Sequence, residues 1–258
     1  MGSNLGKERG NRRSKTGARS GSVLSSRSGL FYARDSDHNE EVGSPFLSLS
    51  PRELSPSALY DLLVSTVQPR PIALVSSISA TGQRNLAPFS FFMLGGNNPP
   101  SLMYSPTLNS AGVPKDSLRN VEETREFVVN LVDREIAEEM NRTSPAYPSD
   151  IDEWRYAHLT PIAGELVKPE RVTESPVQFE CKLFQIVRHG EGPHAANYVI
   201  GEILRIHLRE GVYERGKIDP DALRLVARLG GAEYLDLKAR EIFTMVRPKL
   251  EAQPSIDK

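Results

Sequence analysis

The sequence has 258 residues but only one cysteine, and it contains no long apolar run. Because Cys181 has no second cysteine to pair with, an internal disulfide is excluded, and so is a zinc site built on paired cysteines. The lack of disulfides is typical of a reducing compartment, so we expect a cytoplasmic location. No segment approaches the roughly 20 consecutive apolar residues that a membrane-spanning helix requires. We therefore expect no membrane partner.

A marked excess of one charge is also missing. The chain has 32 Lys and Arg against 33 Asp and Glu, for a formal net charge of −1. This balance gives no general reason to expect nucleic acid as a partner. A barrel that binds nucleic acid would need a basic groove with interleaved aromatic side chains, and the region expected to be ordered offers none. We therefore expect no nucleic-acid partner.

The first 50 residues differ in composition from the remainder. Between Met1 and Arg34 there are eight Lys or Arg and one acid, Glu8, among many serines. Such a segment cannot bury enough apolar surface to offset its ordering entropy, so residues 1–50 are predicted to be a disordered tail that can be removed without loss of fold. An acid-poor start rich in serine and arginine is also typical of an organelle transit peptide, which remains an alternative.

The helices are predicted from their start and stop signals. Ser55 followed by Pro56 is typical of a helix start, because serine supplies a capping oxygen and proline has no N–H to leave unpaired. Pro69 then ends this helix. Three further helices are predicted: one capped by Asp116, one capped by Asp133 with Ile136, Ala137 and Met140 on its inner face, and one from Asp219-Pro220 to Gly230-Gly231 that contains Leu223, Val226 and Ala227.

Strands are predicted to dominate the ordered region. Pro88 lies inside one of them and indicates an edge, a bulge or a ligand-facing position, and Gly201 indicates a bend or bulge in another. Strands joined by hairpins, with few helices between them, favour an antiparallel barrel with short peripheral helices over alternating βαβ units. The predicted strands are residues 72–79, 84–93, 101–105, 127–131, 177–187 and 197–208, with a turn at 80–83 and a loop over 95–100.

One motif that fits a dinucleotide-binding fingerprint is better explained as a hairpin loop. Residues 190–195 match the pattern G-x-G-x-x-A and follow a predicted strand. The fingerprint requires a helix to follow, because the helix N-terminus binds the pyrophosphate. Here Pro193 interrupts the segment, and residues 198–200 are strand formers. We therefore predict no dinucleotide-binding fold.

A second group of residues, between Asn85 and Asn120, has the chemistry of a phosphate site. Residues 85–90 place small and polar side chains on a kinked strand, and Ser105 ends another strand. Lys115-Asp116-Ser117 then opens a helix, where free N–H groups, a hydroxyl and a lysine charge favour an anion. Taken alone, this spacing is more typical of a solvent-exposed helix cap than of a phosphate site.

Nine segments occur in the order found in one protein family. Together they resemble the flavin reductase-like, FMN-binding split-barrel family, also called the flavoprotein oxygenase family. The resemblance covers residues 54–248, which we take as one domain. The segments are RPIALVS (70–76), NLAPFSFF (85–92), PP (99–100), SP (105–106), KDSLRN (115–120), EFVVNL (126–131), ESP (174–176), IGEI (200–203) and RLGG (228–231).

The resemblance implies a mainly β fold, a six-stranded antiparallel Greek-key split barrel with short peripheral helices. It also implies a homodimer with FMN near the subunit interface. Met93 and residues 95–98 depart from the family's pattern near its usual substrate pocket. The implied FMN-binding residues are Asn85, Ala87, Pro88 and Ser90 beside the ribityl chain and isoalloxazine, and Ser105, Lys115, Asp116 and Ser117 around the phosphate, with Asn120 just behind.

The implied activity is hydride transfer from NAD(P)H to FMN, with electrons passed on to oxygen, a partner monooxygenase or another acceptor. The cofactor performs this chemistry, so no catalytic acid, base or nucleophile is predicted. The alternative is an FMN-binding electron carrier that does not itself oxidise NAD(P)H. A third interpretation, a barrel without flavin that binds nucleic acid, is the weakest.

A few other side chains have both a functional and a structural interpretation, and the structural one is favoured for each. Cys181 alternates with apolar residues and is predicted to be a buried core thiol. Arg70 could reach the FMN phosphate, Trp154 could cover the site, and His158 and His194 could approach the flavin. Residues 228–231 are predicted to end a helix near the dimer interface.

Overall fold

The computed structural model describes residues 45–249. Residues 49–249 belong to one compact unit, which the description below concerns. Residues 1–44 of the segment predicted to be a disordered tail lie outside the described residues. The disorder of that tail therefore stays a prediction.

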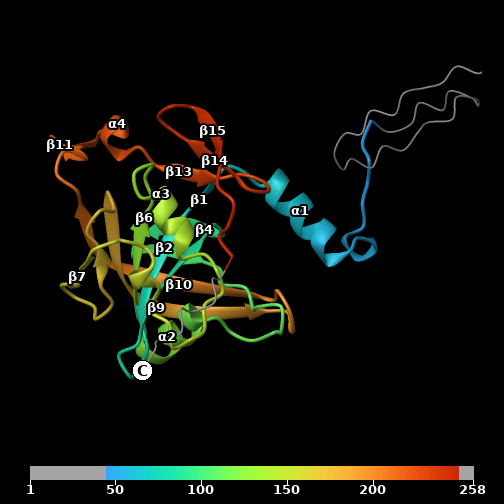
Figure 1. The fold of residues 1–258 in the computed structure, drawn as a ribbon, viewed down its shortest axis with the longest axis horizontal. Coiled ribbons are helices and arrows are strands. Elements are labelled where there is room, and N and C mark those ends of the chain that lie inside the picture. The colour runs from blue at the N-terminus through green and yellow to red at the C-terminus, as the bar shows by residue number, and fades with distance from the viewer. Residues whose placement is uncertain (1–44, 250–258) are drawn as a thin grey trace, which may run out of the picture. The chain divides into compact units, whose positions relative to one another are not determined.

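The main sheet has seven strands in the order β3-β2-β6-β9-β10-β5-β4, and all neighbouring pairs are antiparallel (Figure 1). The mainly β, antiparallel fold class is thus confirmed. Strand β6 follows β5 in the chain, but β9 and β10 lie between them in the sheet. The strands are β2 (Ala73–Ile78), β3 (Arg84–Phe89), β4 (Phe92–Asn97), β5 (Pro100–Tyr104), β6 (Glu126–Leu131), β9 (Val177–His189) and β10 (Ala196–Leu208).

The seventh strand of this sheet comes from a segment that we predicted differently. Residues 84–93 were expected to form one strand and residues 95–100 a loop. Instead β3 ends at Phe89, and Phe92–Asn97 forms β4, paired with β5. The glycines and asparagines of residues 95–98 are typical of a loop, but pairing with β5 overrides that local preference.

A second sheet of four strands has the order β1-β13-β14-β15. The helix predicted from Asp219 to residues 230–231 is wrong over most of its length. Helix α4 covers only Pro220–Leu223, because Arg224 adopts the left-handed conformation and Val226 begins a strand. The spacing of Leu223 and Val226 fits a helix, but pairing of Val226 with Asp236 decides the outcome. The strands are β1 (Arg70–Pro71), β13 (Val226–Arg228), β14 (Glu233–Asp236) and β15 (Glu241–Thr244), and the two small hairpins are β7 (Pro161–Ile162) with β8 (Arg171–Val172) and β11 (Tyr213–Glu214) with β12 (Lys217–Ile218).

The other helices begin close to where their caps predict. Ser55 Oγ accepts a hydrogen bond from Ala58 N at 3.2 Å, which confirms it as the cap of α1. The second helix starts one position earlier than expected, with Lys115 as the cap and Asp116 as its first residue. Asp133 Oδ1 accepts hydrogen bonds from Glu135 N and Ile136 N, but Asp133 is not the cap of the third helix, which is capped by Ile136, three positions later than predicted. The helices are α1 (Pro56–Thr66), α2 (Asp116–Thr124) and α3 (Ala137–Arg142), with short 3₁₀ turns η1 (Pro51–Glu53) and η2 (Glu153–Arg155).

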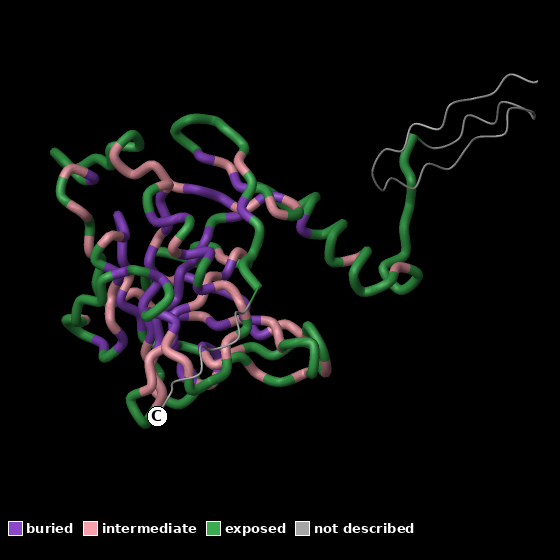
Figure 2. Tube along the Cα trace, in the orientation of Figure 1, coloured by how far each residue is buried: buried purple, intermediate pink, exposed green. Residues whose placement is uncertain are grey.

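Two hydrophobic clusters form the core, one on each face of β2 and β3. Leu74 and Leu86 belong to one cluster, whereas Val75 and Phe89 belong to the other, because alternate side chains of a strand point to opposite faces. Figure 2 shows the buried residues following the strands, whereas most of α1 is exposed. No helix within residues 45–249 is long and apolar enough to cross a membrane.

Gly201 lies at an irregularity of the β9–β10 pairing, as predicted, and it also lies against a buried ring. A Cβ at this position would come within 2.4 Å of Cζ of Phe127, which is fully buried. We expect Gly201→Ala to lower the free energy of unfolding by about 1–2 kcal/mol through overpacking. Urea unfolding measures this loss. Gly96→Ala is the control, since its added methyl meets nothing within 4 Å, and equal stability of both variants would contradict the packing argument.

Candidate flavin site

Strand β3 points Asn85, Ala87 and Phe89 toward the face of the main sheet that packs against helix α2. Phe89 belongs to the core cluster that also contains residues of α2. Asn85 is paired with Ser77 of β2 across the ladder. Asn120 of α2 donates its Nδ2 hydrogen to Ser77 Oγ at 3.2 Å. The structure therefore brings two of the predicted site residues, Asn85 and Asn120, to the same polar region.

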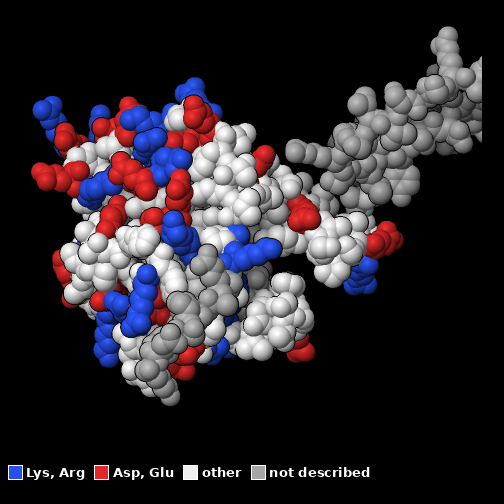
Figure 3. Space-filling view, in the orientation of Figure 1, with Lys and Arg blue, Asp and Glu red and all other residues white. Residues whose placement is uncertain are grey.

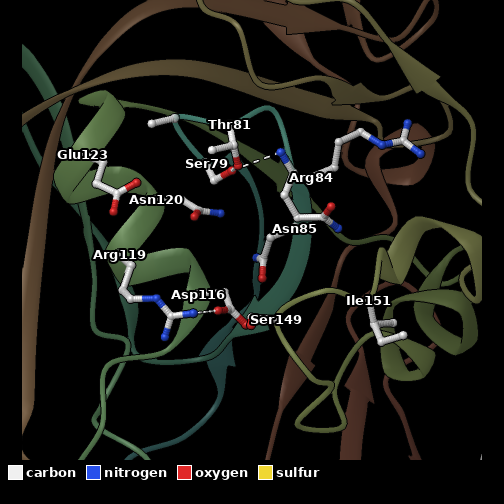
Figure 4. Close-up of a pocket in the computed structure, with 12 residues that line it drawn as sticks. Ser79, Thr81, Arg84, Asn85, Asp116, Arg119, Asn120, Glu123, Ser149 and Ile151 are labelled. Atoms are coloured by element: carbon white, nitrogen blue, oxygen red, sulfur yellow. Dashed lines mark hydrogen bonds and ion pairs between the residues drawn. The ribbon is translucent and has the colours of Figure 1, made fainter.

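A cavity of about 290 Å³ opens beside this region, and we call it the α2 cavity (Figure 4). Asn85, Asp116 and Asn120 line it, together with residues of the turn between β2 and β3. Figure 4 shows Asn120 pointing from the helix toward the strand that carries Asn85. Asp116 is held in an ion pair with Arg119, one turn along the helix. The lining is thus rich in hydrogen-bonding groups that could accept or donate to a hydroxylated chain.

Two buried hydroxyls, one just after β5 and one in the first turn of α2, have no hydrogen-bond partner. Ser105, just after β5, is 7% exposed, and Ser117, the second residue of α2, is 1% exposed. Within residues 45–249, neither Oγ atom has a hydrogen-bond partner. Leaving a buried hydroxyl unpaired costs about 1–3 kcal/mol. A phosphate that accepted a hydrogen bond from each serine would remove this cost, so both residues fit the predicted phosphate site.

Lys115 adds a positive charge at the same end of α2. Its Nζ lies 5.6 Å from the centre of the Phe89 ring. Although the residue as a whole is exposed, desolvation of its ammonium group lowers the pKa of Lys115, and the nearby Arg247 charge lowers it further. The first N–H groups of a helix have no partner within the helix and favour an anion. A phosphate here would interact with both the helix end and the lysine.

The remaining predicted site residues lie near a second cavity. Ala87 is half-buried in the middle of β3. Pro88 and Ser90 line a recess of about 130 Å³, which we call the arginine pocket because Arg70, Arg228 and Arg247 also line it. The predicted site residues of β3 and the residue after it therefore extend from the α2 cavity to the arginine pocket, whereas Ser105, Lys115 and Ser117 line neither cavity.

The structure also reveals a functional candidate that sequence reasoning missed. Glu153 of η2 is 6% exposed, and its Oε2 accepts a hydrogen bond from Leu86 N at 3.1 Å. When the Asn85 amide is oriented so that its oxygen accepts from Leu86 N, its NH₂ group donates to Glu153 Oε1 at 3.3 Å. Burial, together with the nearby carboxylates of Asp116 and Asp152, raises the pKa of Glu153 to about 7. No local signal marks this residue, because its partners lie far away in the sequence.

Other side chains with open interpretations prove to be mainly structural. Arg70 donates to the backbone oxygens of Val67 at 2.8 Å and Leu229 at 2.9 Å, so these contacts hold its guanidinium in place without neutralising its charge. Cys181 is fully buried in the core, as predicted, and Trp154 is 4% exposed within the other cluster. His158 and His194 are both exposed and line neither cavity, and residues 190–195 join β9 to β10 as a hairpin loop.

The charged and polar side chains indicate which kind of ligand the site suits. On the face that Figure 3 shows, acidic and basic side chains are interspersed, without a field of one sign. Among residues 45–249, no group of three or more His, Cys, Asp or Glu is placed to hold a metal ion. The donors around β3 and α2 are hydroxyls, amides and cationic groups. Such a set suits a phosphorylated organic cofactor.

The chain is similar to bacterial proteins over most of its length. The uncharacterized protein YwrF of Bacillus subtilis is 38% identical over 200 residues, which cover 76% of this chain and 96% of YwrF. The uncharacterized protein BH2278 of Halalkalibacterium halodurans is 37% identical over 206 residues, which cover 79% of this chain and 98% of that protein.

Comparison with solved structures and with a family model shows which family the chain belongs to. Component B of nitrilotriacetate monooxygenase from Bacillus cereus is 35% identical, with a TM-score of 0.71, and the match covers 74% of this chain and 96% of that one. The 2-nitrobenzoate 2-nitroreductase NbaA of Pseudomonas fluorescens is 28% identical, with a TM-score of 0.66, and the match covers 82% and 99% of the two chains. Residues 66–223 match the model of the flavin reductase like domain. This chain therefore belongs to the flavin reductase-like family of split-barrel proteins.

Proposed function

We propose that the chain binds FMN and uses NAD(P)H to reduce it. The observation that carries this proposal is the pair of buried, unpartnered hydroxyls of Ser105 and Ser117, with Lys115 close to Ser117 at the start of α2. A phosphate monoester would accept from both hydroxyls and pair with the ammonium group. These three residues provide contacts for one phosphate group. That favours FMN over FAD, whose pyrophosphate would need a second set of contacts.

The other residues of β3 and α2 would bind the remainder of the cofactor. Asn85, Asp116 and Asn120 line the α2 cavity and can exchange hydrogen bonds with ribityl hydroxyls. Pro88 and Ser90 would flank the isoalloxazine, beside the arginine pocket. A bound FMN would supply the redox chemistry for which NAD(P)H is the proposed reductant. The protein binds and orients the flavin and the nicotinamide, and this role requires no catalytic acid, base or nucleophile.

A second candidate is an electron carrier that receives electrons without oxidising NAD(P)H itself. The match with component B of nitrilotriacetate monooxygenase favours the reductase, since a monooxygenase component in a family of flavin reductases would supply reduced flavin to a partner. By the same analogy, a separate monooxygenase is the partner that we propose for the reduced flavin here.

The test separates reductase from carrier by the absorbance of the flavin. We expect full-length protein to purify yellow, or to turn yellow when FMN is added, and to release FMN rather than FAD on heating. Adding NADH or NADPH without oxygen should then bleach the flavin absorbance within seconds. A yellow protein that neither nucleotide bleaches would be a carrier. A protein that binds no flavin would contradict both functions.

We also propose that the chain forms a homodimer, and the apolar surface of α1 supports it. Tyr60 is 56% exposed and Leu63 is 51% exposed, and Val64 is the one residue of this helix that is buried. Burying a leucine stabilises an interface by about 1.5–3 kcal/mol. Leu63→Glu should therefore raise the dimer dissociation constant at least about tenfold in light-scattering measurements. Ser57→Glu, at an exposed polar position of the same helix, should not. A monomeric wild type would contradict the dimer.

A further inference from the structure

The arginine pocket holds more positive charge than its surroundings neutralise. Arg70, Arg228 and Arg247 line it, and among the described residues Asp61 of α1 is the one acid that does so. Among residues 45–249, none of these arginines forms an ion pair with a carboxylate. Elsewhere in the same fold an arginine at a cavity is neutralised, as Arg84 is by its ion pairs with two carboxylates.

Two of these arginines are cross-strand neighbours. Arg70 of β1 and Arg228 of β13 are opposite residues in an antiparallel pair. Like charges in this position are destabilising. Burial, and to a smaller extent the Arg228 charge, lowers the pKa of Arg70. The fold therefore keeps an unfavourable pair that a bound anion would stabilise.

Two of the three guanidinium groups, those of Arg70 and Arg228, are held in place by the fold. Arg70 donates hydrogen bonds to the backbone oxygens of Val67 and Leu229, and its Nε donates to Ser90 Oγ at 3.4 Å. Arg228 donates from Nη2 to Gly231 O at 2.6 Å, and its Cζ lies 4.5 Å from the centre of the Tyr234 ring. Cationic groups held rigidly in this way lose little entropy when they bind a ligand.

We propose that the arginine pocket binds the oxyanion group, a phosphate or a carboxylate, of the molecule that exchanges electrons with the flavin. This inference rests on the proposed function, because Pro88 and Ser90 connect the pocket to the segment that would flank the isoalloxazine. Arginine forks match carboxylate and phosphate geometry. Tyr60 and Tyr234 give the pocket aromatic walls. Its volume of about 130 Å³ holds a phosphate group or a small aromatic acid, and not a whole dinucleotide.

Two sources of that oxyanion can be distinguished with paired probes. The first is the 2′-phosphate of NADPH, for which 2′-AMP is the probe and adenosine its neutral partner. The second is an aromatic carboxylic acid, for which benzoate is the probe and benzamide its neutral partner. Calorimetric titration of full-length, FMN-loaded protein measures all four. We expect one anion to bind at least about tenfold more tightly than its neutral partner, because it gains a charge-assisted contact.

The variants test whether the arginines cause this preference. Arg228→Gln should weaken the preferred anion at least about tenfold and leave the neutral probe unchanged. Arg247→Gln should also weaken binding of the preferred anion. Because Arg247 is exposed, this variant keeps the test valid even if Arg228→Gln disturbs the fold. Arg155→Gln removes the same charge from an exposed residue outside the pocket and should have no effect.

The outcomes are distinct. Selectivity for 2′-AMP supports the pocket and assigns it to NADPH, and selectivity for benzoate supports it and assigns it to an aromatic acid. The proposal is overturned if neither anion is preferred over its neutral partner, or if Arg155→Gln weakens binding as much as Arg228→Gln. A failure of both nucleotides to bleach the flavin would contradict the reductase function alone, because the calorimetric preference does not depend on turnover.

Discussion

Glu153→Gln is expected to raise the free energy of unfolding at about pH 8 by about 2–4 kcal/mol, and to change it little at about pH 4. The pKa of the Glu153 carboxyl is raised by burial, and further by nearby acids, from 4.5 to about 7 in the folded chain. Between these two values the unfolded chain has released the proton and the folded chain has not. Folding must then take up a proton, so stability falls as the pH rises through this range. Glutamine does not titrate, so the variant does not lose stability in this pH range.

The amide is also a good replacement for the contacts that the carboxyl makes. A glutamine oxygen can still accept from Leu86 N, and Asn85 can rotate its amide to accept from the new NH₂ group. Urea unfolding of flavin-free protein at about pH 4, 6 and 8 measures the effect. Glu214→Gln, at an exposed position, is the control and should show no such trend. A constant difference across pH, or a loss of stability at about pH 8, would show that Glu153 is not a buried acid.

The parts of the fold that local chemistry determines could be predicted from the sequence. The cap at Ser55, the long strands β9 and β10, and the irregularity at Gly201 are confirmed, because capping, β-branched runs and a missing Cβ act on neighbouring residues. Strand β13 could not be predicted in this way. Val226 fits a helical spacing locally, and its pairing with Asp236 decides otherwise. Strand β4 similarly depends on pairing with β5.

The candidate site shows the same division. Asn85 and Asn120 were expected to share a site, and the structure places both on one cavity. Glu153 reaches Asn85 and Leu86 only through the tertiary fold, so its sequence neighbours gave no indication. The arginine pocket is likewise assembled from α1, β1, β13 and the segment after β15. Contacts between such distant segments have no signature in a single sequence.

Lys115→Ala is expected to raise the FMN dissociation constant at least about tenfold. The lysine contact with a phosphate is charge-assisted and contributes roughly 1.5–3 kcal/mol, and about 1.4 kcal/mol is tenfold in affinity. Ser117→Ala removes a neutral hydrogen bond of about 0.5–1.5 kcal/mol, so its effect on FMN should be smaller. Because the Ser117 hydroxyl is buried without a partner, this second variant should also make flavin-free protein slightly more stable. General damage to the fold would not explain a variant that binds FMN more weakly and yet is more stable without flavin.

The most direct test of the account compares FMN with riboflavin, which lacks the phosphate, by fluorescence titration of wild type and Lys115→Ala. Lys182→Ala, at an exposed position of β9, serves as the control. We predict that wild type and the control prefer FMN by at least about tenfold, and that Lys115→Ala loses most of this preference while its affinity for riboflavin is unchanged. Equal weakening of both ligands, or an undiminished preference for FMN, would contradict a phosphate site at the start of α2.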